Sequence, residues 1–583
     1  MSIHKTGIDW QEWSPEALDR AREKNCPVLL AITATWCHWC HVMENTTFES
    51  EQVAEIINSR FVPVRVDNDR RPDLNARYNM GGWPTIAFLT PKGDILTGST
   101  YVPPGQMVDM LNRVADAYQE KGIELAERAE EIRNRQAEAG REMASAVILN
   151  ESIPKNIMKA IEGAFDPVYA GFGVQQKFLY VPALEFLLAD FRRTGNRGHL
   201  EMVTRTLNAM REGGVYDQVE GGFFRYSTTR NWSIPHYEKM LEDNSGLLGV
   251  FIQAFGLTGE KSYIKTVRAI MGYLGKTLFD KQTGAFFGSQ DAVEDYYQLS
   301  VEDRVIEGPP SVDRTIYTNW NAVAVDVYLK ASETTGVLSY LGRALGILGF
   351  LTNHCRADGG FCHYFDGEPK AFGMLTDQVW VGTALLRAYE CTGNRRFIET
   401  AKDTADYIQS RFADPNGGFF DVTAERQEAE RLPYREKPLD ENALAARFLN
   451  RLSYYAHESA YRRSAESALR SMASDYESFG ILAAPYGLAV MELLEEPVRI
   501  AVVGPREDPR TEELLTSTLK AKDPSTLVQV LDEDASPEEF RDFGAEPSEE
   551  PRASICIGDT CRTTSSDPLE VEAAIHEVEQ RTY

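Results

Sequence analysis

The chain has 583 residues, of which 43% are hydrophobic and 26% charged, and its net charge at pH 7 is −27. This length exceeds what one hydrophobic core supports, so we expect several domains. The acidic balance argues against nucleic acid or an anionic membrane as a partner, because phosphate groups would be repelled. We find no run of about 18 apolar residues. The first seven residues also lack an apolar signal-peptide core, so we expect a cytoplasmic protein without a membrane partner.

Two cysteines near the N-terminus, Cys37 and Cys40, form the strongest local motif. They follow the apolar run Val28–Ile32, which predicts a buried strand, and they precede a helix-like segment from His41 to Ser59. A dithiol at a strand-to-helix junction is typical of a thioredoxin-type redox site. The reason is physical, since the positive end of the helix dipole stabilises the reactive thiolate.

The segment Trp83-Pro84-Thr85 strengthens this interpretation. It leads into an apolar strand at residues 86–89, and thioredoxins carry a cis-proline at the corresponding position beside their dithiol. We therefore predict a cis Trp83–Pro84 bond facing Cys37. The same resemblance implies that Cys37 is the attacking nucleophile and that Cys40 resolves the mixed disulfide.

Two histidines and one alanine make the motif unusual. His38 and His41 flank the cysteines and, when protonated, would favour the thiolate and a more oxidising couple. Thioredoxins carry a buried acid six residues before the first cysteine, and this chain has Ala31 there. Proton handling for Cys40 is then arranged differently, or is slow.

Two other interpretations of Cys37-His38-Trp39-Cys40-His41 stay open. The spacing also fits the attachment pattern of c-type haem, although the strand, the helix and Trp83-Pro84 disagree with a haem cradle. Zinc bound by both cysteines and both histidines would place four ligands within five residues, which strains a tetrahedral site. We favour the redox site and expect no metal and no cofactor.

Beyond a charged helix expected from Ala115 to about Met143, the chain repeats a helical unit. Apolar helices alternate with turns that carry glycine and an aromatic residue, namely Gly171-Phe172-Gly173, Gly221-Gly222-Phe223, Gly284-Ala285-Phe286, Gly359-Gly360-Phe361, Gly417-Gly418-Phe419 and, more loosely, Ser478-Phe479-Gly480. A period of about 55–75 residues indicates an array of helical hairpins. Six such units resemble the (α/α)6 toroid of many carbohydrate-active enzymes, in which the turns gather at one mouth.

We expect the mouth of this toroid to bind a ligand, because sugars stack on aromatic rings and hydrogen-bond to carboxylates. The densest loops supply the candidate binding residues Asp217, Arg225, Tyr226, Trp232, His236, Glu238, Asp243, Asn244, Trp320, His363 and Asp377. His236 or Glu238 is a candidate general acid or base, and His363 a candidate opposing base for a two-base epimerase. Hydrolysis would instead use a carboxylate pair drawn from Asp217, Asp243, Asp313, Asp377 or Asp440.

The chain as a whole resembles the spermatogenesis-associated thioredoxin-domain family, whose members join a thioredoxin-like domain to a six-hairpin toroid. The residues that carry the resemblance are Cys37-His38-Trp39-Cys40-His41-Val42-Met43-Glu44, Val66-Asp67, Arg71-Pro72-Asp73, Gly81-Gly82-Trp83-Pro84, Phe88-Leu89-Thr90-Pro91, Gly98 to Pro103, Pro235 to Asn244 and Trp320-Asn321. Two departures stand out: the insert before Gly81 is shorter, and Gly173 to Phe178 lacks the expected prolines.

From Pro497 the pattern changes to short apolar strands and helices, which predicts a small α/β region. It holds a second close pair, Cys556 and Cys561, for which an inert pair is favoured over a redox pair near the dithiol. The expected fold is therefore multidomain. Its parts are a thioredoxin-like α/β domain at 1–118, a linker helix at 119–150, an all-α (α/α)6 toroid at 151–496 and a small α/β region at 497–583.

Three functions follow from this architecture. The first is a thiol–disulfide oxidoreductase whose toroid binds a client, with a disulfide-containing client or a reductase as partner. The second is a carbohydrate-acting enzyme, an epimerase or a glycoside hydrolase with a saccharide ligand, regulated by the thioredoxin-like domain. The third is a binding or scaffold protein with neither activity.

Overall fold

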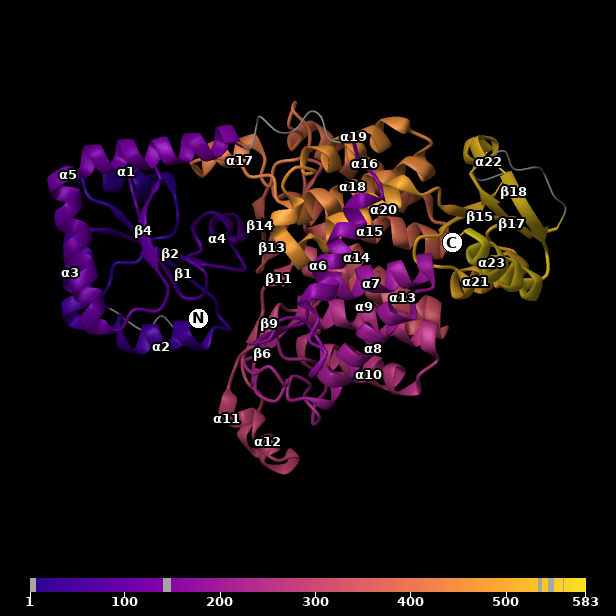
Figure 1. The fold of residues 1–583 in the computed structure, drawn as a ribbon, viewed down its shortest axis with the longest axis horizontal. Coiled ribbons are helices and arrows are strands. Elements are labelled where there is room, and N and C mark those ends of the chain that lie inside the picture. The colour runs from indigo at the N-terminus through magenta and orange to yellow at the C-terminus, as the bar shows by residue number, and fades with distance from the viewer. Residues whose placement is uncertain (1–6, 140–147, 533–536, 544–549, 559, 583) are drawn as a thin grey trace.

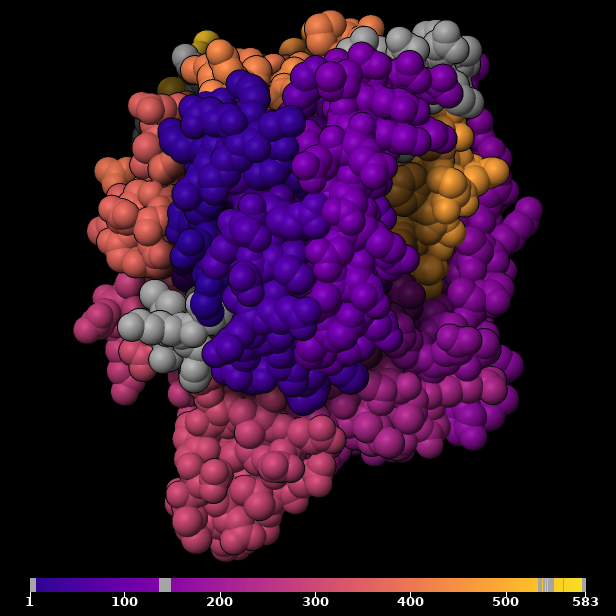
Figure 2. Space-filling model, turned by 90° about the vertical axis from the view of Figure 1, so that its left-hand side faces the viewer, coloured from indigo at the N-terminus to yellow at the C-terminus, as the bar shows by residue number. Residues whose placement is uncertain are grey.

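The computed structural model describes residues 7–139, 148–532, 537–543, 550–558 and 560–582. Three parts follow one another along the longest axis of the molecule (Figure 1). An N-terminal α/β domain lies at one end, a ring of helices lies in the middle, and a C-terminal α/β domain lies at the other end. Seen from the N-terminal side, the first domain lies in front of the middle of the molecule, with parts of the ring visible around it (Figure 2).

The N-terminal domain is built on a four-stranded sheet with the order β2-β1-β3-β4. β1 pairs with β2 in parallel and with β3 antiparallel, and β3 pairs with β4 antiparallel. The strands are β1 (Val28–Thr33), β2 (Val62–Asp67), β3 (Thr85–Leu89) and β4 (Ile95–Ser99), and the first helices are α1 (Pro15–Glu23), α2 (His38–Thr46), α3 (Glu51–Arg60) and α4 (Pro72–Tyr78). Every residue of β1 is buried, since its side chains enter a hydrophobic cluster on each face of the sheet.

Helix α5 (Pro104–Ala139) connects this domain to the ring. It starts earlier than the expected linker helix, and its first half packs against α3 and β4. Lys121 interrupts it with non-helical backbone angles, and the helix then turns across the top of the domain (Figure 1). Arg133 fastens the second half through a 2.6 Å ion pair with the buried Asp94. Residues 140–147 of the expected linker lie outside the described residues.

Six inner helices of the described chain form a closed ring, which confirms the expected (α/α)6 toroid. Each inner helix contacts the next and the last contacts the first, in the order α7 (Val181–Thr194), α9 (Leu241–Thr258), α13 (Thr318–Thr335), α15 (Leu375–Thr392), α18 (Leu439–Ala456) and α20 (Ala484–Leu494). Their outer partners, in the same order, are α8 (Arg197–Glu212), α10 (Lys261–Tyr273), α14 (Leu338–His354), α16 (Arg395–Arg411), α19 (Ser459–Ser471) and α6 (Ser152–Ala164).

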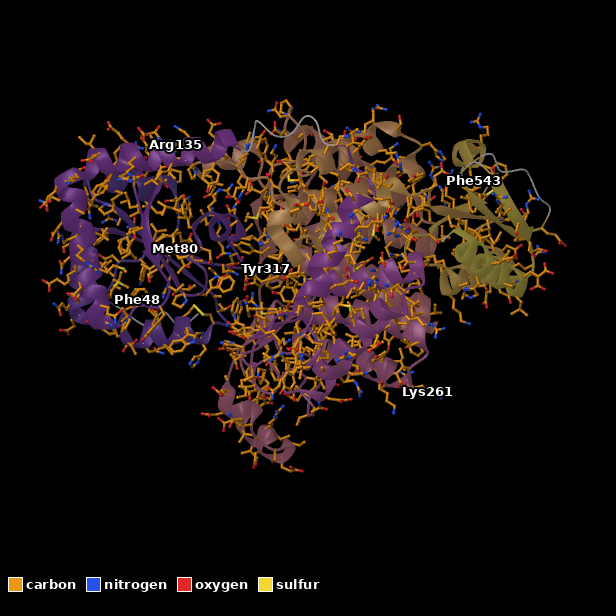
Figure 3. All side chains as sticks on the ribbon, viewed as in Figure 1. Phe48, Met80, Arg135, Lys261, Tyr317 and Phe543 are labelled. Atoms are coloured by element: carbon orange, nitrogen blue, oxygen red, sulfur yellow. A yellow bond between two sulfur atoms is a disulfide. The ribbon has the colours of Figure 1, made fainter. Side chains whose placement is uncertain are left out.

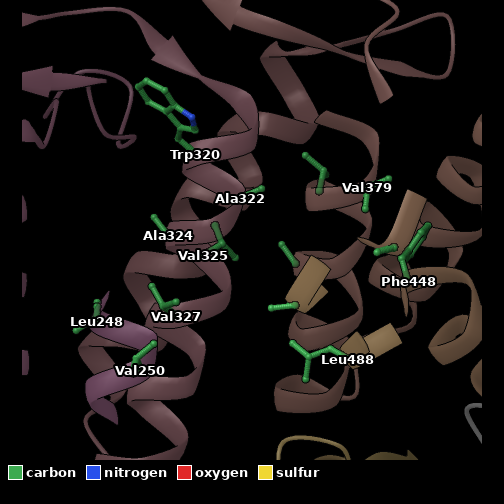
Figure 4. Packing of buried hydrophobic residues seen from close by; sticks show 14 of the residues in the cluster. Leu248, Val250, Trp320, Ala322, Ala324, Val325, Val327, Val379, Phe448 and Leu488 are labelled. Carbon is green, nitrogen blue, oxygen red and sulfur yellow. The ribbon is translucent and has the colours of Figure 1, made fainter. Parts of the chain in front are cut away.

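One large hydrophobic cluster runs through this ring, and Figure 4 shows part of it, including Val327, Phe448 and Leu488. The stretch Tyr476–Leu494, which contains α20, is long and apolar enough to cross a membrane by length and composition, with a mean hydropathy of 1.2. In the structure, α20 packs between α7 and α18 as an inner helix of the ring. Its apolar side chains are therefore used in the protein core.

Short strands and helices fill the connections between hairpins, mostly at the end of the ring that faces the N-terminal domain (Figure 1). They are β5 (Lys177–Phe178), β6 (Tyr226–Ser227), β7 (Pro235–His236), β8 (Lys239–Met240), β9 (Ser289–Gln290), β10 (Val312–Asp313), β11 (Ile316–Tyr317), β12 (Arg356–Ala357), β13 (Gly360–Phe365), β14 (Pro369–Phe372), α11 (Glu294–Tyr297), α12 (Val301–Glu307), α17 (Ala424–Ala429), the π-helix η1 (Leu274–Leu278) and the 3₁₀ helix η2 (Tyr476–Ala483).

The repeated glycine–aromatic turns have a structural cause. At four of them, a buried amide in the first turn of the next inner helix accepts a hydrogen bond from the backbone N–H of the aromatic residue and donates one to its carbonyl. The pairs are Asn244 with Phe223, Asn321 with Phe286, Gln378 with Phe361 and Asn442 with Phe419. Each amide also bonds a carbonyl four residues earlier, so it ties turn and helix together.

The C-terminal domain repeats the topology of the N-terminal one. Its sheet has the order β16-β15-β17-β18, and β15 pairs in parallel with β16 and antiparallel with β17, which pairs antiparallel with β18. The elements are β15 (Val498–Val503), α21 (Pro509–Ala521), β16 (Leu527–Leu531), α22 (Pro537–Phe543), β17 (Arg552–Ile557), β18 (Thr560–Ser565) and α23 (Pro568–Thr582). The expected small α/β region is therefore a second sheet of thioredoxin-like order.

The ring holds the N-terminal domain by a buried ion pair and the C-terminal domain by hydrogen bonds from an arginine that is itself paired within the ring. On the N-terminal side, Arg77 of α4 contacts Asp421 at 2.8 Å, with exposed side-chain fractions of 0% and 8%. On the C-terminal side, Arg451 of α18 pairs with Glu390 at 2.6 Å and donates to the backbone carbonyls of residues 524–526. The three parts therefore form one continuous body, with Tyr317 at the junction of the ring and the N-terminal domain (Figure 3).

Candidate functional site

The dithiol lies where α2 begins. Cys37 occupies the N-cap position, its sulfur accepts a hydrogen bond from the backbone N–H of Cys40 at 3.2 Å, and the two cysteines are paired as a disulfide. Both residues are buried, with 4% and 5% of their surface exposed. A sulfur at a helix N-terminus gains stability as a thiolate, which suits Cys37 for thiol–disulfide exchange.

The neighbours of the dithiol are those of a thioredoxin-type site. The Trp83–Pro84 bond is cis, which confirms the prediction made from the motif. The turn before it is held by Asn79, whose side-chain oxygen accepts from the N–H groups of Gly81 and Gly82. His41 contacts the carbonyl of Thr35 at 2.8 Å. His38 and His41 are both exposed on α2, away from the buried sulfur atoms.

Ala31 of β1 stands where thioredoxins have a buried acid. In this structure, carboxyl groups lie instead at and just after the end of the neighbouring strand β2. Asp69 accepts a 2.6 Å hydrogen bond from the indole N–H of Trp36, the residue before Cys37, and burial raises the pKa of Asp69. Burial and the nearby Asp69 and Asp313 carboxylates raise the pKa of Asp67 to about 7. Asp69 therefore lies next to the residue that precedes Cys37, just after the end of β2, whereas the acid of thioredoxins would stand at Ala31 on β1.

The dithiol opens into a cavity of about 870 Å³ that is shared with the ring. Trp36, Cys37 and Trp83 line it on the N-terminal side, and side chains of all six inner helices line it on the other. Five of the predicted binding residues also line it, namely Arg225, Tyr226, His236, Glu238 and Asp243. Its volume is in the range of small-molecule sites. One cavity therefore joins the predicted redox site to the predicted mouth of the toroid.

Arg225 connects the two domains inside this cavity. Its guanidinium carbon lies 3.9 Å from the centre of the Trp36 ring and 5.2 Å from that of Trp83, so the cation stacks on both indoles beside the dithiol. Its Nη1 is buried and has no hydrogen-bond partner in the described part of the chain. A residue of the ring thus places a positive charge beside the two indoles that frame the N-terminal site.

Glu238 and His236 form the polar wall next to Arg225. The Nδ1 atom of His236 hydrogen-bonds to one oxygen of Glu238, and the His236 ring stacks on Tyr226 with 5.0 Å between ring centres. Glu238 is fully buried, and its other oxygen, Oε1, has no partner among the described residues. Burial and the Glu238 carboxylate raise the pKa of Tyr226 to about 12. This wall offers an unused acceptor to a ligand.

Four more carboxylates line the cavity at the first turns of α9 and α18. Their exposed surface faces the cavity, and the surrounding walls enclose them. Enclosure, with repulsion from neighbouring carboxylates, raises the pKa of Glu242 to about 7 and that of Asp243 to about 6. Burial likewise raises the pKa of Asp440 and, together with Asp440, that of Glu441. Asp243 Oδ2 and Glu441 Oε2 have no hydrogen-bond partner in the described ranges.

Several predicted residues lie behind the cavity wall. Asp217 is buried in ion pairs with Lys239 at 2.7 Å and Arg304 at 2.9 Å, where it holds the loop before β6. Trp232 is buried and donates its indole N–H to the carbonyl of Tyr169. Asn244 is the amide clamp of the Phe223 turn, and Trp320 packs on Tyr317. The structure places all four in the scaffold around the mouth.

His363 and Asp377 lie at the boundary between ring and N-terminal domain. The Nδ1 atom of His363 contacts both carboxylate oxygens of Asp377 at 3.1 Å, and its Nε2 contacts the backbone carbonyl of Asp69 at 2.8 Å. Burial lowers the pKa of His363, but the Asp377 carboxylate outweighs it and raises the pKa overall. Both ring nitrogens are therefore engaged, and the pair joins the domains beneath Asp69.

The cavity also contains residues that were not among the candidate binding residues. Glu242 and Glu441 line it, and Trp36 and Trp83 frame the dithiol. A sequence signal exists for the acids, because they stand one or two residues before the clamp amides Asn244 and Asn442. No three His, Cys, Asp or Glu residues in the described part of the chain are placed to hold a metal ion. The pair Cys556–Cys561 is a disulfide of the β17–β18 hairpin, in the domain farthest from α2 (Figure 1).

Comparisons with known proteins identify the class of the N-terminal domain. Residues 1–137 match the family model Thioredox_DsbH, described as "Protein of unknown function, DUF255". A 115-residue match, 24% identical, links 18% of this chain to 69% of the disulfide bond reductase DsbH of Chlamydia pneumoniae. The N-terminal part is thus a thioredoxin-like domain of the DsbH type.

About half of the chain is similar to spermatogenesis-associated protein 20 of Mus musculus. The two are 32% identical over 311 residues, which are 49% of this chain and 39% of the mouse protein. The matched part therefore spans about two fifths of that relative. These matches confirm the family resemblance expected from the motifs. The structure of cellobiose 2-epimerase from Spirochaeta thermophila aligns with 59% of this chain. The alignment includes 96% of the epimerase chain, with a TM-score of 0.48 and 14% sequence identity.

Proposed function

We propose that the protein is a thiol–disulfide oxidoreductase whose Cys37–Cys40 dithiol acts on a disulfide held in the cavity of the helical ring. The observation that carries the proposal is that Cys37 lines this cavity together with residues of the ring. Its position at the start of α2 and the adjacent cis-proline turn support the same chemistry. A cytoplasmic location, with reduced thiols as electron source, fits a reducing role.

The roles of the two cysteines follow from their positions. The Cys37 thiolate attacks one sulfur of the substrate, and the substrate disulfide breaks and releases one thiolate. The Cys40 thiolate then attacks the sulfur of Cys37 in the mixed disulfide and releases the second thiol. Two electrons pass to the substrate, Cys37 and Cys40 become a disulfide, and a dithiol reductant such as a thioredoxin restores them. Asp69, which accepts a hydrogen bond from Trp36, is a candidate to accept protons.

The enclosure of Cys37 limits the substrate. A residue with 4% of its surface exposed at the wall of a cavity of about 870 Å³ is reached by a small disulfide or by one extended segment of a client. A folded protein surface does not fit such a space. The toroid therefore acts as the substrate-binding part of the enzyme in this proposal.

Trapping of the mixed disulfide tests the proposal. With Cys40→Ala, a substrate disulfide should form a stable adduct at Cys37 that intact-mass spectrometry detects, and catalytic turnover should stop. Cys37→Ala should form no adduct, and Cys561→Ser should behave as the unmodified protein does. If Cys40→Ala forms no adduct with any disulfide and the intact protein shows no reductase activity, the proposal is wrong.

A second candidate is a carbohydrate-acting enzyme that the N-terminal domain regulates. The observation that favours it is the fully buried Glu238, whose free oxygen lies beside Asp243 in an aromatic-walled cavity. A carboxylate so placed acts as a general base toward a sugar carbon or water. Glu238→Gln should then abolish turnover of a saccharide while Cys37→Ala leaves part of it. If the unmodified protein neither reduces a disulfide nor turns over a saccharide, the third function, a scaffold protein, is favoured.

A further inference from the structure

The cations and carboxylates of the shared cavity are distributed unevenly. Toward the C-terminal domain, the cations that line it in the described chain are each held in an ion pair. The pairs are Arg192 with Asp523, Arg193 with Glu495, Lys330 with Asp326, Arg387 with Asp326, Arg447 with Glu492 and Arg451 with Glu390. Charge at this end is therefore largely balanced, and an incoming ion gains little there.

The end next to the dithiol has a large excess of carboxylates. Glu238 stands on the connection between β7 and β8, Glu242 and Asp243 on the first turn of α9, and Asp440 and Glu441 on the first turn of α18. Arg225 is the one cation that lines this end in the described residues. The five carboxyl groups therefore face a single guanidinium.

Three of these five carboxyl groups have one oxygen without a hydrogen-bond partner among the described residues. Glu238 is fully buried, and its Oε1 has no partner among the described residues, as is also true of Asp243 Oδ2 and Glu441 Oε2. A buried acceptor without a partner is costly, so a donor that reaches one of these oxygens from the cavity is stabilised there. An ammonium group supplies up to three such donors together with a positive charge.

The carboxyl cluster lies close to the reacting sulfur, and a bound cation favours its ionised form. Burial raises the pKa of both Glu242 and Asp243, and the Arg225 cation opposes this rise in each, which places these carboxyl groups near it. The same guanidinium stacks on Trp36, next to Cys37. The guanidinium contacts the faces of both indoles, and it is the cation that stands against five carboxyl groups at this end of the cavity in the described residues. Low-dielectric walls focus the field of such a cluster, which concentrates cations and repels anions.

Resting on the oxidoreductase function proposed above, we infer that the substrates are small disulfides that carry ammonium groups, and that carboxylate-bearing disulfides are disfavoured. The ammonium group binds among Glu238, Glu242, Asp243, Asp440 and Glu441, and this holds the disulfide against Cys37. The Cys37 thiolate attacks the nearer sulfur, and the first aminothiol leaves as a thiolate. Cys40 then displaces the second aminothiol, and a dithiol reductant restores the cysteine pair.

Three probe disulfides of different charge test this inference on the full chain. Cystamine carries two ammonium groups, bis(2-hydroxyethyl) disulfide is neutral, and oxidised glutathione is anionic. The reduced protein is mixed with each, and the loss of its free thiols is timed. Each rate is divided by the rate of the same disulfide with free dithiothreitol, which removes intrinsic reactivity. The normalised rate for cystamine should exceed that of the neutral probe about tenfold, and that of oxidised glutathione should fall below it.

Charge-neutralising variants sharpen the test. Glu242→Gln combined with Asp243→Asn should reduce the cystamine-to-neutral ratio to about threefold or less. Glu201→Gln combined with Glu212→Gln on the exposed face of α8 removes the same charge outside the cavity and should leave the ratio unchanged. The ratio of the unmodified protein should also fall at high salt, a readout that does not depend on the folding of a variant.

The outcomes separate the two proposals. If none of the three disulfides is reduced and Cys40→Ala also traps no peptide disulfide, the oxidoreductase function itself is wrong. If only a peptide disulfide is trapped, the inference about small substrates is wrong and the oxidoreductase function stands. If all are reduced at equal normalised rates, or oxidised glutathione is preferred, the inference about charge is wrong and the oxidoreductase function stands. A preference for cystamine that neither the cavity variant nor high salt reduces also overturns the inference.

Discussion

The two end domains share one sheet topology, but they differ in where their cysteines lie and in the proline bond before the third strand. Both have a central strand paired in parallel on one side and antiparallel on the other, with the order β2-β1-β3-β4 at one end and β16-β15-β17-β18 at the other. After β1 the chain places Cys37 and Cys40 at a helix start, whereas after β15 it continues Gly504-Pro505-Arg506. Chemistry therefore resides in the loops that the sheet presents.

The proline before the third strand shows the same contrast. Pro84 precedes β3 and Pro551 precedes β17, but Trp83–Pro84 is the one cis bond among the described residues. The cysteines of the C-terminal sheet lie opposite each other in the β17–β18 hairpin. One sheet thus presents a dithiol to the cavity, while the other closes the far end of the ring through the segment around Pro524.

The largest expected difference between the two cysteine pairs is in activity. Cys37→Ser should lower the rate of disulfide reduction on the order of 100-fold or more, because exchange requires a thiolate at the attacking position. Cys561→Ser should leave this rate within about twofold, since its disulfide lies in the opposite end domain. Turnover of a small disulfide with a dithiol reductant measures both. Equal losses in the two variants would contradict the assignment of roles.

The two domain attachments should differ in sensitivity. Arg77→Met leaves the buried Asp421 without its ion-pair partner and should cost about 3–5 kcal/mol of stability. Arg451→Met should cost less, because Glu390 keeps its contacts with Arg387 and Tyr455. Denaturant unfolding followed domain by domain through limited proteolysis gives both values. A larger loss for Arg451→Met would reverse the comparison.

The N-terminal sheet should also respond to pH through Asp67. Its folded pKa is about 7, whereas the unfolded chain releases this proton near pH 4. Between these values the unfolded state binds fewer protons than the folded state, so the free energy of unfolding falls as pH rises from about 4 to about 7, by about 2–4 kcal/mol. Hydrogen exchange of β1 and β2 at pH 5 and pH 8 measures this fall. Asp67→Asn should remove most of it.

The smallest expected effect concerns the C-terminal disulfide. It closes a loop of only five residues in sequence separation, so its removal by Cys556→Ser with Cys561→Ser should cost about 2 kcal/mol. The loss should appear as faster hydrogen exchange in β17 and β18 alone. Slower disulfide reduction in this variant would show that the second pair takes part in catalysis after all.

The sequence by itself determined the elements with a local signal. Short motifs predict the dithiol, the cis-proline and the helix hairpins, because a helix start, a tight turn and an apolar period each depend on residues that are close in sequence. Even the order of the parts along the chain followed from these patterns. The glycine–aromatic repeat was visible as well, although its cause, the clamp amides such as Asn244, required the structure.

Only the tertiary structure decided which candidates share a site. Arg225 reaches Trp36 across about 190 residues of sequence, and His363 reaches the carbonyl of Asp69 across 294. Such contacts carry no periodic signal, so Asp217 and Glu238 looked alike in the sequence. One is neutralised by Lys239 and Arg304, and the other keeps an oxygen free toward the cavity. Long-range packing, which sets burial and ion pairing, made that difference.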